Sequence, residues 1–143
     1  MGCGTAGQVS ADVSKGRKEV ITSLKGAPPV GPYSQAIRAG DFIFVAGVKG
    51  LDPETGKVVS GGIQAETRQA LLNIQAVLEA GGASLDDAVS SVVHLADINE
   101  FQQMNAVYGE FFKQDPPGRT TLQAAALPAG ANIEITITTY SPR

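Results

Sequence analysis

The chain has 143 residues, a formal net charge of -3 and a charged fraction of 17%. Binding to nucleic-acid phosphates needs clustered basic residues, but the 11 lysines and arginines here are scattered, which argues against a nucleic-acid partner. The length suits one domain, and the low charge favours a subunit that covers apolar surface by self-association. The single cysteine excludes an internal disulfide and a cysteine-rich zinc site, so a reducing compartment such as the cytoplasm is expected.

Residues 1–17 are rich in small side chains and show no hydrophobic periodicity, so we interpret them as a flexible tail before a folded domain at 18–143. Gly2 and Cys3 resemble the start of an acylated protein, but Ala6 replaces the usual serine or threonine, which makes acylation a weak alternative. A short organelle-targeting signal is another alternative. No apolar run approaches the roughly 20 residues that span a bilayer, so no transmembrane segment is expected.

The first part of the domain predicts strands at 19–23, 34–38 and 42–46, where β-branched and aromatic side chains gather. The short segment 39–41 predicts a hairpin turn between the second and third strands. A helix follows the 52–56 turn, because apolar residues recur there at helical spacing and two glycines then end the pattern. The residues that carry this pattern are Ile63, Thr67, Leu71, Ile74, Leu78, Gly81 and Gly82.

The segment 88–95 predicts a fourth strand, reached through a βαβ-type crossover. A second helix is predicted from Asn99 to about Lys113, with Asp97 or Asn99 as its cap. Its expected buried face consists of Phe101, Met104, Tyr108, Phe111 and Phe112.

The last two strands are predicted at 119–127 and 132–140, joined as a hairpin around 128–130. The expected order is therefore βββαβαββ, an α+β fold with a six-stranded mixed sheet and two helices on one face. The final strand alternates isoleucines with polar residues, so the uncovered face is expected to be solvated or to meet another subunit.

Few residues outside the turns suggest chemistry. Arg119 is a lone charge at the start of an otherwise uncharged strand, and a guanidinium there can bind a carboxylate through two parallel hydrogen bonds. His94 is the single histidine; a structural role on its strand is favoured, and one chain cannot form a two-histidine ribonuclease site. The glycines at 47–50 and 61–62 are wrongly spaced for phosphate or dinucleotide binding, and no metal or cofactor is expected.

Several motifs in order give a specific resemblance to a known family. They are 31-GPYSQA-36, 52-DPETG-56, 66-ETRQALLNIQAVLEAGG-82, 104-MNAVYGEFF-112 and 117-PGRTTLQAAALPAGANIEI-135. Together they closely resemble the RidA family, also called YjgF or L-PSP.

The resemblance implies a chorismate-mutase-like α+β subunit, assembled as a homotrimer with ligand sites in the clefts between subunits. It also implies hydrolysis of reactive 2-imino acids, such as 2-iminobutanoate and 2-iminopropanoate, to 2-oxo acids and ammonia without a cofactor. These imines arise from enamines released by dehydratases that use pyridoxal phosphate (PLP), so the activity would protect PLP enzymes from damage.

Four residues fall on family site positions. The resemblance implies that Arg119 clamps the substrate carboxylate and that Glu134 holds the attacking water or carries a proton to the departing ammonia. It places Tyr33 in the cleft from the neighbouring subunit and Asn105 at the substrate. Independently of the family, Gly47 lies at the end of the third predicted strand, where a backbone group can approach a small ligand.

Two positions depart from the family pattern. Thr121 stands where some members have cysteine, which excludes a thiolate mechanism and leaves this strand position a backbone role at the imine. Val48 stands where many have glutamine, which makes the site wall less polar and could change which imino acid fits.

The predicted hairpin creates a geometric difficulty for the site. It pairs Glu134 with Ala125 and leaves it on the order of 20 Å from Arg119. Either the register differs or the two residues meet through subunit packing. Two other functions remain open: a translation-inhibiting endoribonuclease, and a non-catalytic trimer that binds small carboxylates or acts like a chaperone.

Overall fold

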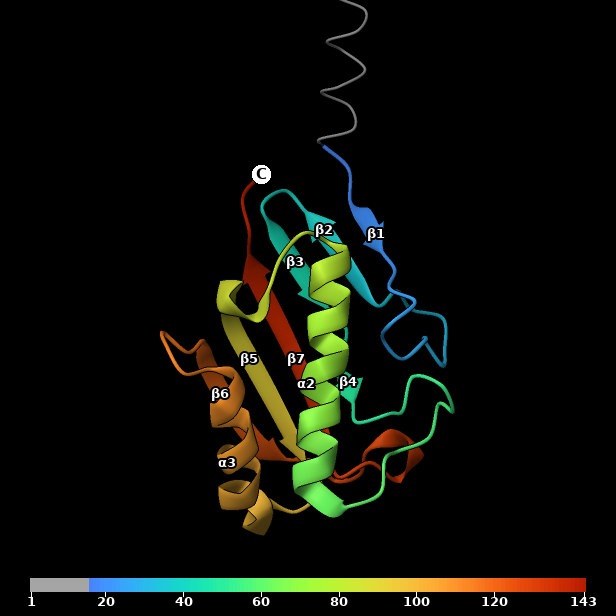
Figure 1. Cartoon of the computed structure of the whole chain (residues 1–143), viewed down its shortest axis with the longest axis vertical. Coiled ribbons are helices and arrows are strands. Elements are labelled where there is room, and N and C mark those ends of the chain that lie inside the picture. Colours follow the sequence, from blue (N-terminus) through green and yellow to red (C-terminus); the bar gives the residue numbers. More distant parts are fainter. Residues whose placement is uncertain (1–15) are drawn as a thin grey trace, which may run out of the picture.

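The computed structural model describes residues 16–143, and Figure 1 shows two helices lying across a single twisted sheet. The proposed acylation at Gly2 and Cys3, and the tail apart from its last two residues, lie outside the described residues. No helix in the described part is long and apolar enough to cross a membrane. In chain order the elements are β1 (Glu19–Ile21), β2 (Ala36–Ala39), β3 (Phe42–Val45), β4 (Val48–Lys49), α2 (Gly62–Ala80), η1 (Leu85–Asp87), β5 (Ala88–Leu95), η2 (Ile98–Glu100), α3 (Phe101–Phe111), β6 (Gly118–Gln123), η3 (Pro128–Gly130) and β7 (Ile133–Tyr140).

The sheet has the order β1-β2-β3-β7-β5-β6, and the two-residue strand β4 pairs with β7 beyond the end of β3. Strands β5 and β6 are parallel, while the other pairs are antiparallel, so the predicted mixed sheet is confirmed. The sequence analysis missed β4, which lengthens the β3 side of the sheet along β7.

The predicted hairpin between the last two strands is wrong. Strand β5 lies between β6 and β7, pairing parallel with β6 and antiparallel with β7. Strand β6 also ends at Gln123 rather than at residue 127. The long β7 pairs with β5 from Ile133 to Thr139, which leaves the sheet edge to β6. Local turn signals cannot reveal such an insertion, because the inserted strand is more than 20 residues away in sequence.

The remaining strands and both helices lie close to their predicted positions. Strand β5 has the predicted bounds, and the β2–β3 hairpin turns at Gly40, whose φ of 60° suits a residue without a side chain. Gly81 and Gly82 end α2, and the N–H of Asn99 donates to the Asp97 carboxylate at the start of η2, just before α3. Asp97 therefore caps the 3₁₀ turn η2 rather than α3 as predicted, and the N-cap of α3 is Glu100, without a side-chain cap bond.

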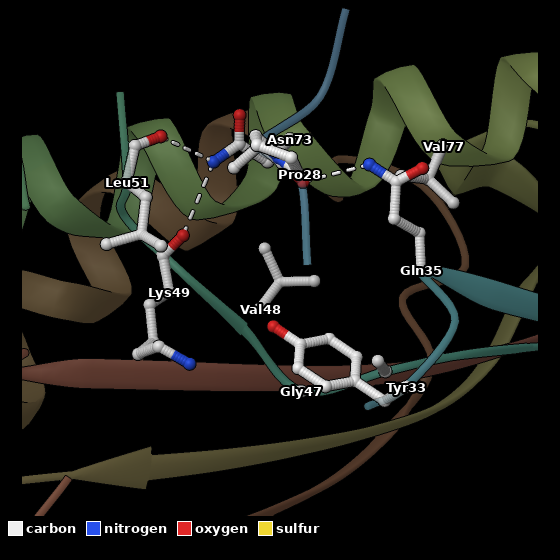
Figure 2. A pocket seen from close by; sticks show the side chains of 11 residues that line it. Pro28, Tyr33, Gln35, Gly47, Val48, Lys49, Leu51, Asn73 and Val77 are labelled. Atoms are coloured by element: carbon white, nitrogen blue, oxygen red, sulfur yellow. Dashed lines mark hydrogen bonds between the residues drawn. The ribbon is translucent and has the colours of Figure 1, made fainter. Parts of the chain in front are cut away.

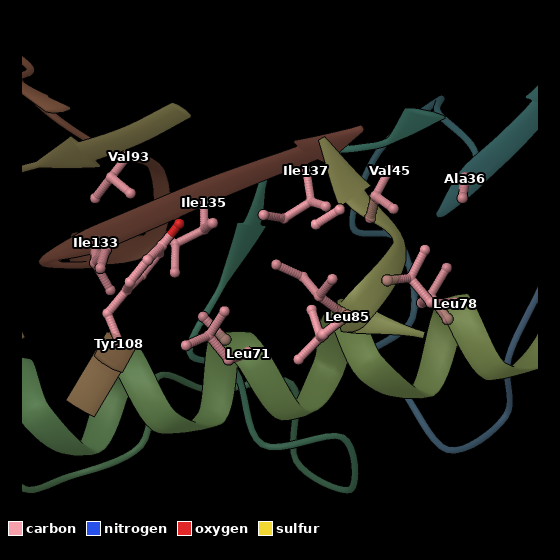
Figure 3. Packing of buried hydrophobic residues seen from close by; sticks show 14 of the residues in the cluster. Ala36, Val45, Leu71, Leu78, Leu85, Val93, Tyr108, Ile133, Ile135 and Ile137 are labelled. Carbon is pink, nitrogen blue, oxygen red and sulfur yellow. The ribbon is translucent and has the colours of Figure 1, made fainter. Parts of the chain in front are cut away.

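The core lies between the helices and one face of the sheet. The isoleucines at alternate positions of β7 (Ile133, Ile135, Ile137) are fully buried, and Figure 3 shows them pointing toward α2. Leu71 and Leu78 project from α2 into the same layer. The period of two on β7 and the helical period on α2 thus meet in one apolar layer, as binary patterning requires.

The opposite face of the sheet is open and carries large apolar side chains. The rings of Phe42 and Tyr140 lie 5.3 Å apart, and Phe44 lies beside Phe42. Five residues of this face are between 39% and 61% exposed, namely Val20, Phe42, Phe44, Leu122 and Tyr140. A group of exposed apolar side chains such as Phe42, Phe44 and Tyr140 typically marks an interface with another protein surface.

Candidate functional site

The predicted site residues fall into two groups, and the first lies at the edge of the sheet. Arg119 is the second residue of the edge strand β6 and pairs with Ser91 of β5. Its guanidinium carbon stands 4.7 Å from the ring centre of Tyr108 and 5.5 Å from that of Phe101, both on α3. Stacking on these rings orients the guanidinium and keeps its edge N–H groups available. We call Arg119, these two rings and the neighbouring side chains of Asn105, Ser91 and Thr121 the edge cluster.

Arg119 has no ion-pair partner in the part of the chain that the structure describes. It shares a shallow hollow of about 350 Å³ with Asn105 and Tyr108 of α3 and the prolines before β6. A small organic acid fits a space of this size. The structure therefore brings together Arg119 and Asn105, two of the residues that the sequence analysis selected.

The edge cluster contains buried polar atoms without a partner among the described residues. They include the side-chain oxygens of Asn105 (Oδ1), Tyr108, Ser91 and Thr121. Burial raises the pKa of the Tyr108 hydroxyl, and the nearby Ser91 and Arg119 oppose that rise. Buried polar groups normally have hydrogen-bond partners, so this group of polar side chains around one cation favours a ligand site here. Tyr108 and Ser91 were not predicted as site residues, because a tyrosine on a helix face reads as core.

The second group surrounds Gly47, between β3 and β4. Gly47 and Tyr33 line a small cavity of about 30 Å³ beneath α2, shown in Figure 2 with Val48 and Lys49 of β4. This volume holds a water molecule but no organic substrate. The Tyr33 hydroxyl accepts a hydrogen bond from the N–H of Val30 at 3.2 Å, which holds the ring over this region.

Glu134 lies directly against Gly47. A side-chain carbon built at residue 47 would stand 2.6 Å from Glu134 Oε1, so any larger residue there would force this carboxylate to move. Lys49 Nζ donates to Glu134 Oε2 at 3.3 Å. We call Tyr33, Gly47, Lys49 and Glu134 the glycine cluster. Lys49 was not predicted as a site residue. The signal available in the sequence was its place in a two-residue segment between glycines, whose two side chains point to opposite faces of the sheet.

The side chains of Arg119 and Glu134 lie on opposite faces of the sheet. Arg119 is in register with Ser91 and, through it, with Ile137 on the helix-covered face. Glu134 is three residues from Ile137 along β7, so its side chain projects from the open face. Three residues along the strand and two strand spacings put the two Cα atoms roughly 14 Å apart. The register thus differs from the predicted one, yet the two side chains still do not meet within one chain.

Three other predicted residues can be placed as well. Thr121 lies two residues after Arg119 on the same face of β6, opposite Val93. Val48 lies in β4, packs against the core and lines the small cavity. His94 lies on the open face of β5, directly across from Glu134, and no hydrogen bond joins their side chains. Its ring nitrogen Nδ1 is buried without a partner in residues 16–143.

Taken together, these features define a class of protein: an α+β subunit with two helices on one sheet face, an oriented arginine at the sheet edge, and a carboxylate on the open face. A family model described as Endoribonuclease L-PSP matches residues 24–141. The chain belongs to this family, the RidA, YjgF or L-PSP family that its motifs resemble.

Relatives and solved structures agree with this assignment. A RutC family protein of Pyrococcus horikoshii is 47% identical over 86% of this chain and 98% of its own length. The human 2-iminobutanoate/2-iminopropanoate deaminase is 42% identical over 82% of this chain and 86% of its own length. The crystal structure of RidA from an Antarctic Psychrobacter species is 37% identical, covers 85% of this chain and 98% of its own, and superposes with a TM-score of 0.83. The predicted fold class is thereby confirmed.

Proposed function

We propose that the protein hydrolyses small 2-imino acids, such as 2-iminobutanoate and 2-iminopropanoate, to 2-oxo acids and ammonia. The observation that carries the proposal is the edge cluster, in which an oriented guanidinium with no ion-pair partner in residues 16–143 faces a hollow sized for a small acid. Relatives named as 2-iminobutanoate/2-iminopropanoate deaminases, at 41 to 42% identity, support the choice of reaction.

The chemistry needs few groups. A water oxygen adds to the carbon of the C=N bond while its protons pass to the nitrogen. The C–N bond then breaks, which releases ammonia and forms the carbonyl of the 2-oxo acid. Arg119 binds the substrate carboxylate through its guanidinium, and Asn105 supplies an amide beside it. Because such imines also hydrolyse in plain water, orientation and modest acid-base help suffice for acceleration.

Glu134 supplies the acid-base group, accepting a proton from the attacking water and passing it toward the departing nitrogen. It is on the other face of the sheet from Arg119, so we propose that each site forms between two copies of the chain. The edge cluster of one copy would face the glycine cluster of the next, with Tyr33 completing the wall. Thr121 would contribute its backbone, and no cofactor takes part.

The exposed apolar residues of the open face support this assembly, because a sheet face of this composition gains stability when another copy covers it. We propose a homotrimer, in keeping with the family resemblance. Light scattering after gel filtration should then give about 44 kDa, three times the 14.7 kDa of one chain. A mass of one chain at micromolar concentration would contradict the shared site.

The activity is tested by generating 2-iminobutanoate with a threonine dehydratase and following its loss in the presence of the protein. The wild type should accelerate hydrolysis beyond buffer, and Arg119→Ala should abolish the acceleration while the assembly mass stays unchanged. Equal rates with wild type, Arg119→Ala and buffer would sink the deaminase proposal. If calorimetry then still shows 2-oxobutanoate bound at Arg119, the protein is a carboxylate-binding trimer.

The description of the matching family model favours a second candidate, an endoribonuclease. The net charge of -3 and the single histidine offer little for RNA binding or cleavage. RNA cleavage by the purified wild type that disappears in Arg119→Ala would support this candidate. Cleavage that persists in the variant would point to a contaminant or a different surface.

A further inference from the structure

Three titratable side chains stand in one line across the open face. The backbone register puts Lys49 of β4 opposite Glu134 of β7, and Glu134 opposite His94 of β5. Side chains in register on one face of a sheet are neighbours. Glu134 therefore has a cationic neighbour on one side and an imidazole on the other, and only the lysine bonds to it.

Lys49 is unusual because it is buried. Its side chain is 7% exposed, against 23% for Glu134, and the described residues offer its ammonium no acidic partner other than Glu134. Removing an ammonium from water costs free energy that only a close opposite charge and good hydrogen bonds offset. Burial of the Lys49 ammonium is therefore favourable only while the Glu134 carboxylate lies beside it.

One oxygen of Glu134 has a hydrogen-bond partner, and the other fills space left by a glycine. Oε2 accepts from Lys49, and Oε1 occupies the place that a side chain at residue 47 would need. The carboxylate is thus held by charge on one side and lies against Gly47 on the other.

The strand that carries Lys49 is itself anchored to the helix layer. Asn73 of α2 is buried, and its amide nitrogen donates to the carbonyl oxygens of Lys49 at 3.3 Å and Leu51 at 2.8 Å. These bonds tie β4 to α2, as Figure 2 shows. The ammonium is therefore presented to Glu134 from a rigid backbone, the arrangement that precise orientation of an acid-base group requires.

We propose that Lys49 is a positioning residue for Glu134: it holds the carboxylate in the orientation that accepts the water proton during imine hydrolysis. This inference rests on the proposed deaminase function. Lys49 acts through Glu134 and does not touch the substrate, which Arg119 binds. Loss of Lys49 should therefore lower kcat and leave KM almost unchanged.

The test compares kcat and KM for 2-iminobutanoate among lysine variants. Lys49→Met should lower kcat about 10-fold to 100-fold, the cost of a misplaced catalytic group, with KM within about threefold of wild type. Lys49→Arg, which keeps the charge, should recover most of the loss. Lys57→Met removes an exposed lysine from the neighbouring turn and serves as the matched control, with kcat unchanged.

A double variant separates positioning from an independent role. If Lys49 works through Glu134, then Lys49→Met combined with Glu134→Gln should be no slower than Glu134→Gln alone. Multiplied losses, an unchanged kcat in Lys49→Met, or a loss confined to KM would overturn the proposal. If Lys49→Met fails to fold by circular dichroism, Lys49→Gln takes its place in the same cycle.

Failure of this inference and failure of the deaminase function give different results. When the wild type is no faster than buffer and equals Arg119→Ala, the function itself is wrong and the role of Lys49 falls with it. When the wild type is active and Lys49→Met matches it, the function stands and only the positioning role is wrong.

Discussion

The edge cluster and the glycine cluster solve opposite electrostatic problems. At the edge, Arg119 is oriented by the rings of Tyr108 and Phe101 and keeps its charge without an ion-pair partner among the described residues. At the glycine cluster, the carboxylate of Glu134 is already paired with the ammonium of Lys49 within the chain. The first arrangement suits binding of an external carboxylate, while the second suits an internal group that must hold its place during proton transfer.

The largest expected effect tests whether the two clusters work together across chains. Arg119→Ala and Glu134→Gln proteins should each be nearly inactive in imine hydrolysis. After unfolding and joint refolding in equal amounts, a seam with Arg119 from one copy and Glu134 from the next forms in about one quarter of cases. The mixture should therefore regain about a quarter of the wild-type rate. A mixture as inactive as its components would contradict a site built from two chains.

Gly47→Ala is expected to have the next largest effect, because the added carbon would stand 2.6 Å from Glu134 Oε1. The carboxylate must move, so kcat for 2-iminobutanoate should fall about 10-fold to 100-fold. Calorimetry should still detect binding of 2-oxobutanoate at the edge cluster. Gly118→Ala is a suitable control, since the nearest atom to its added carbon is 3.8 Å away.

Tyr108 gives a pH-dependent prediction for the edge cluster. Burial raises the pKa of its hydroxyl above the ordinary value of 10.0, so the folded state holds this proton more tightly than the unfolded state. The stabilisation is complete below pH 10 and is lost as the pH rises through the folded pKa, at about 1.4 kcal/mol per pH unit. The free energy of unfolding, measured in urea between about pH 9 and pH 11, one unit either side of the ordinary value, should decline less steeply with pH for Tyr108→Phe than for the wild type. Identical slopes would refute the pKa shift.

His94→Leu is expected to have the smallest effect on activity. The imidazole faces Glu134 across β5 and β7, but no hydrogen bond joins the two side chains. Imine hydrolysis should stay within about threefold of wild type, since general acid-base participation contributes about 100-fold or more. A loss of about 100-fold or more would place His94 in the glycine cluster. The expected difference between His94, with a small effect, and Lys49, with a large one, would then be wrong.

Much of the fold could be predicted because its signals are local. The bounds of β5, the glycine stop of α2 and the alternation on β7 each depend on residues within one element. The position of β5 between β6 and β7 could not be predicted. A turn at 128–130 suggests a hairpin, but a turn signal does not specify which strand pairs with which.

The same division applies to the site. Arg119 was recognised because an isolated charge on an apolar strand is conspicuous, and motif resemblance added Asn105, Glu134 and Tyr33. Lys49 was missed, because a lysine in a glycine-rich turn is normally a solvated surface residue.

The sequence by itself determined where the main strands and helices lie, which faces are apolar, and which family the motifs resemble. Those properties follow from side-chain periodicity and from short motifs. Only the tertiary structure decided that Arg119 and Glu134 point to opposite faces of the sheet, and that Lys49 is buried against Glu134. The reason is that strand order and register place residues from distant segments side by side, and a shift of one residue moves a side chain to the other face.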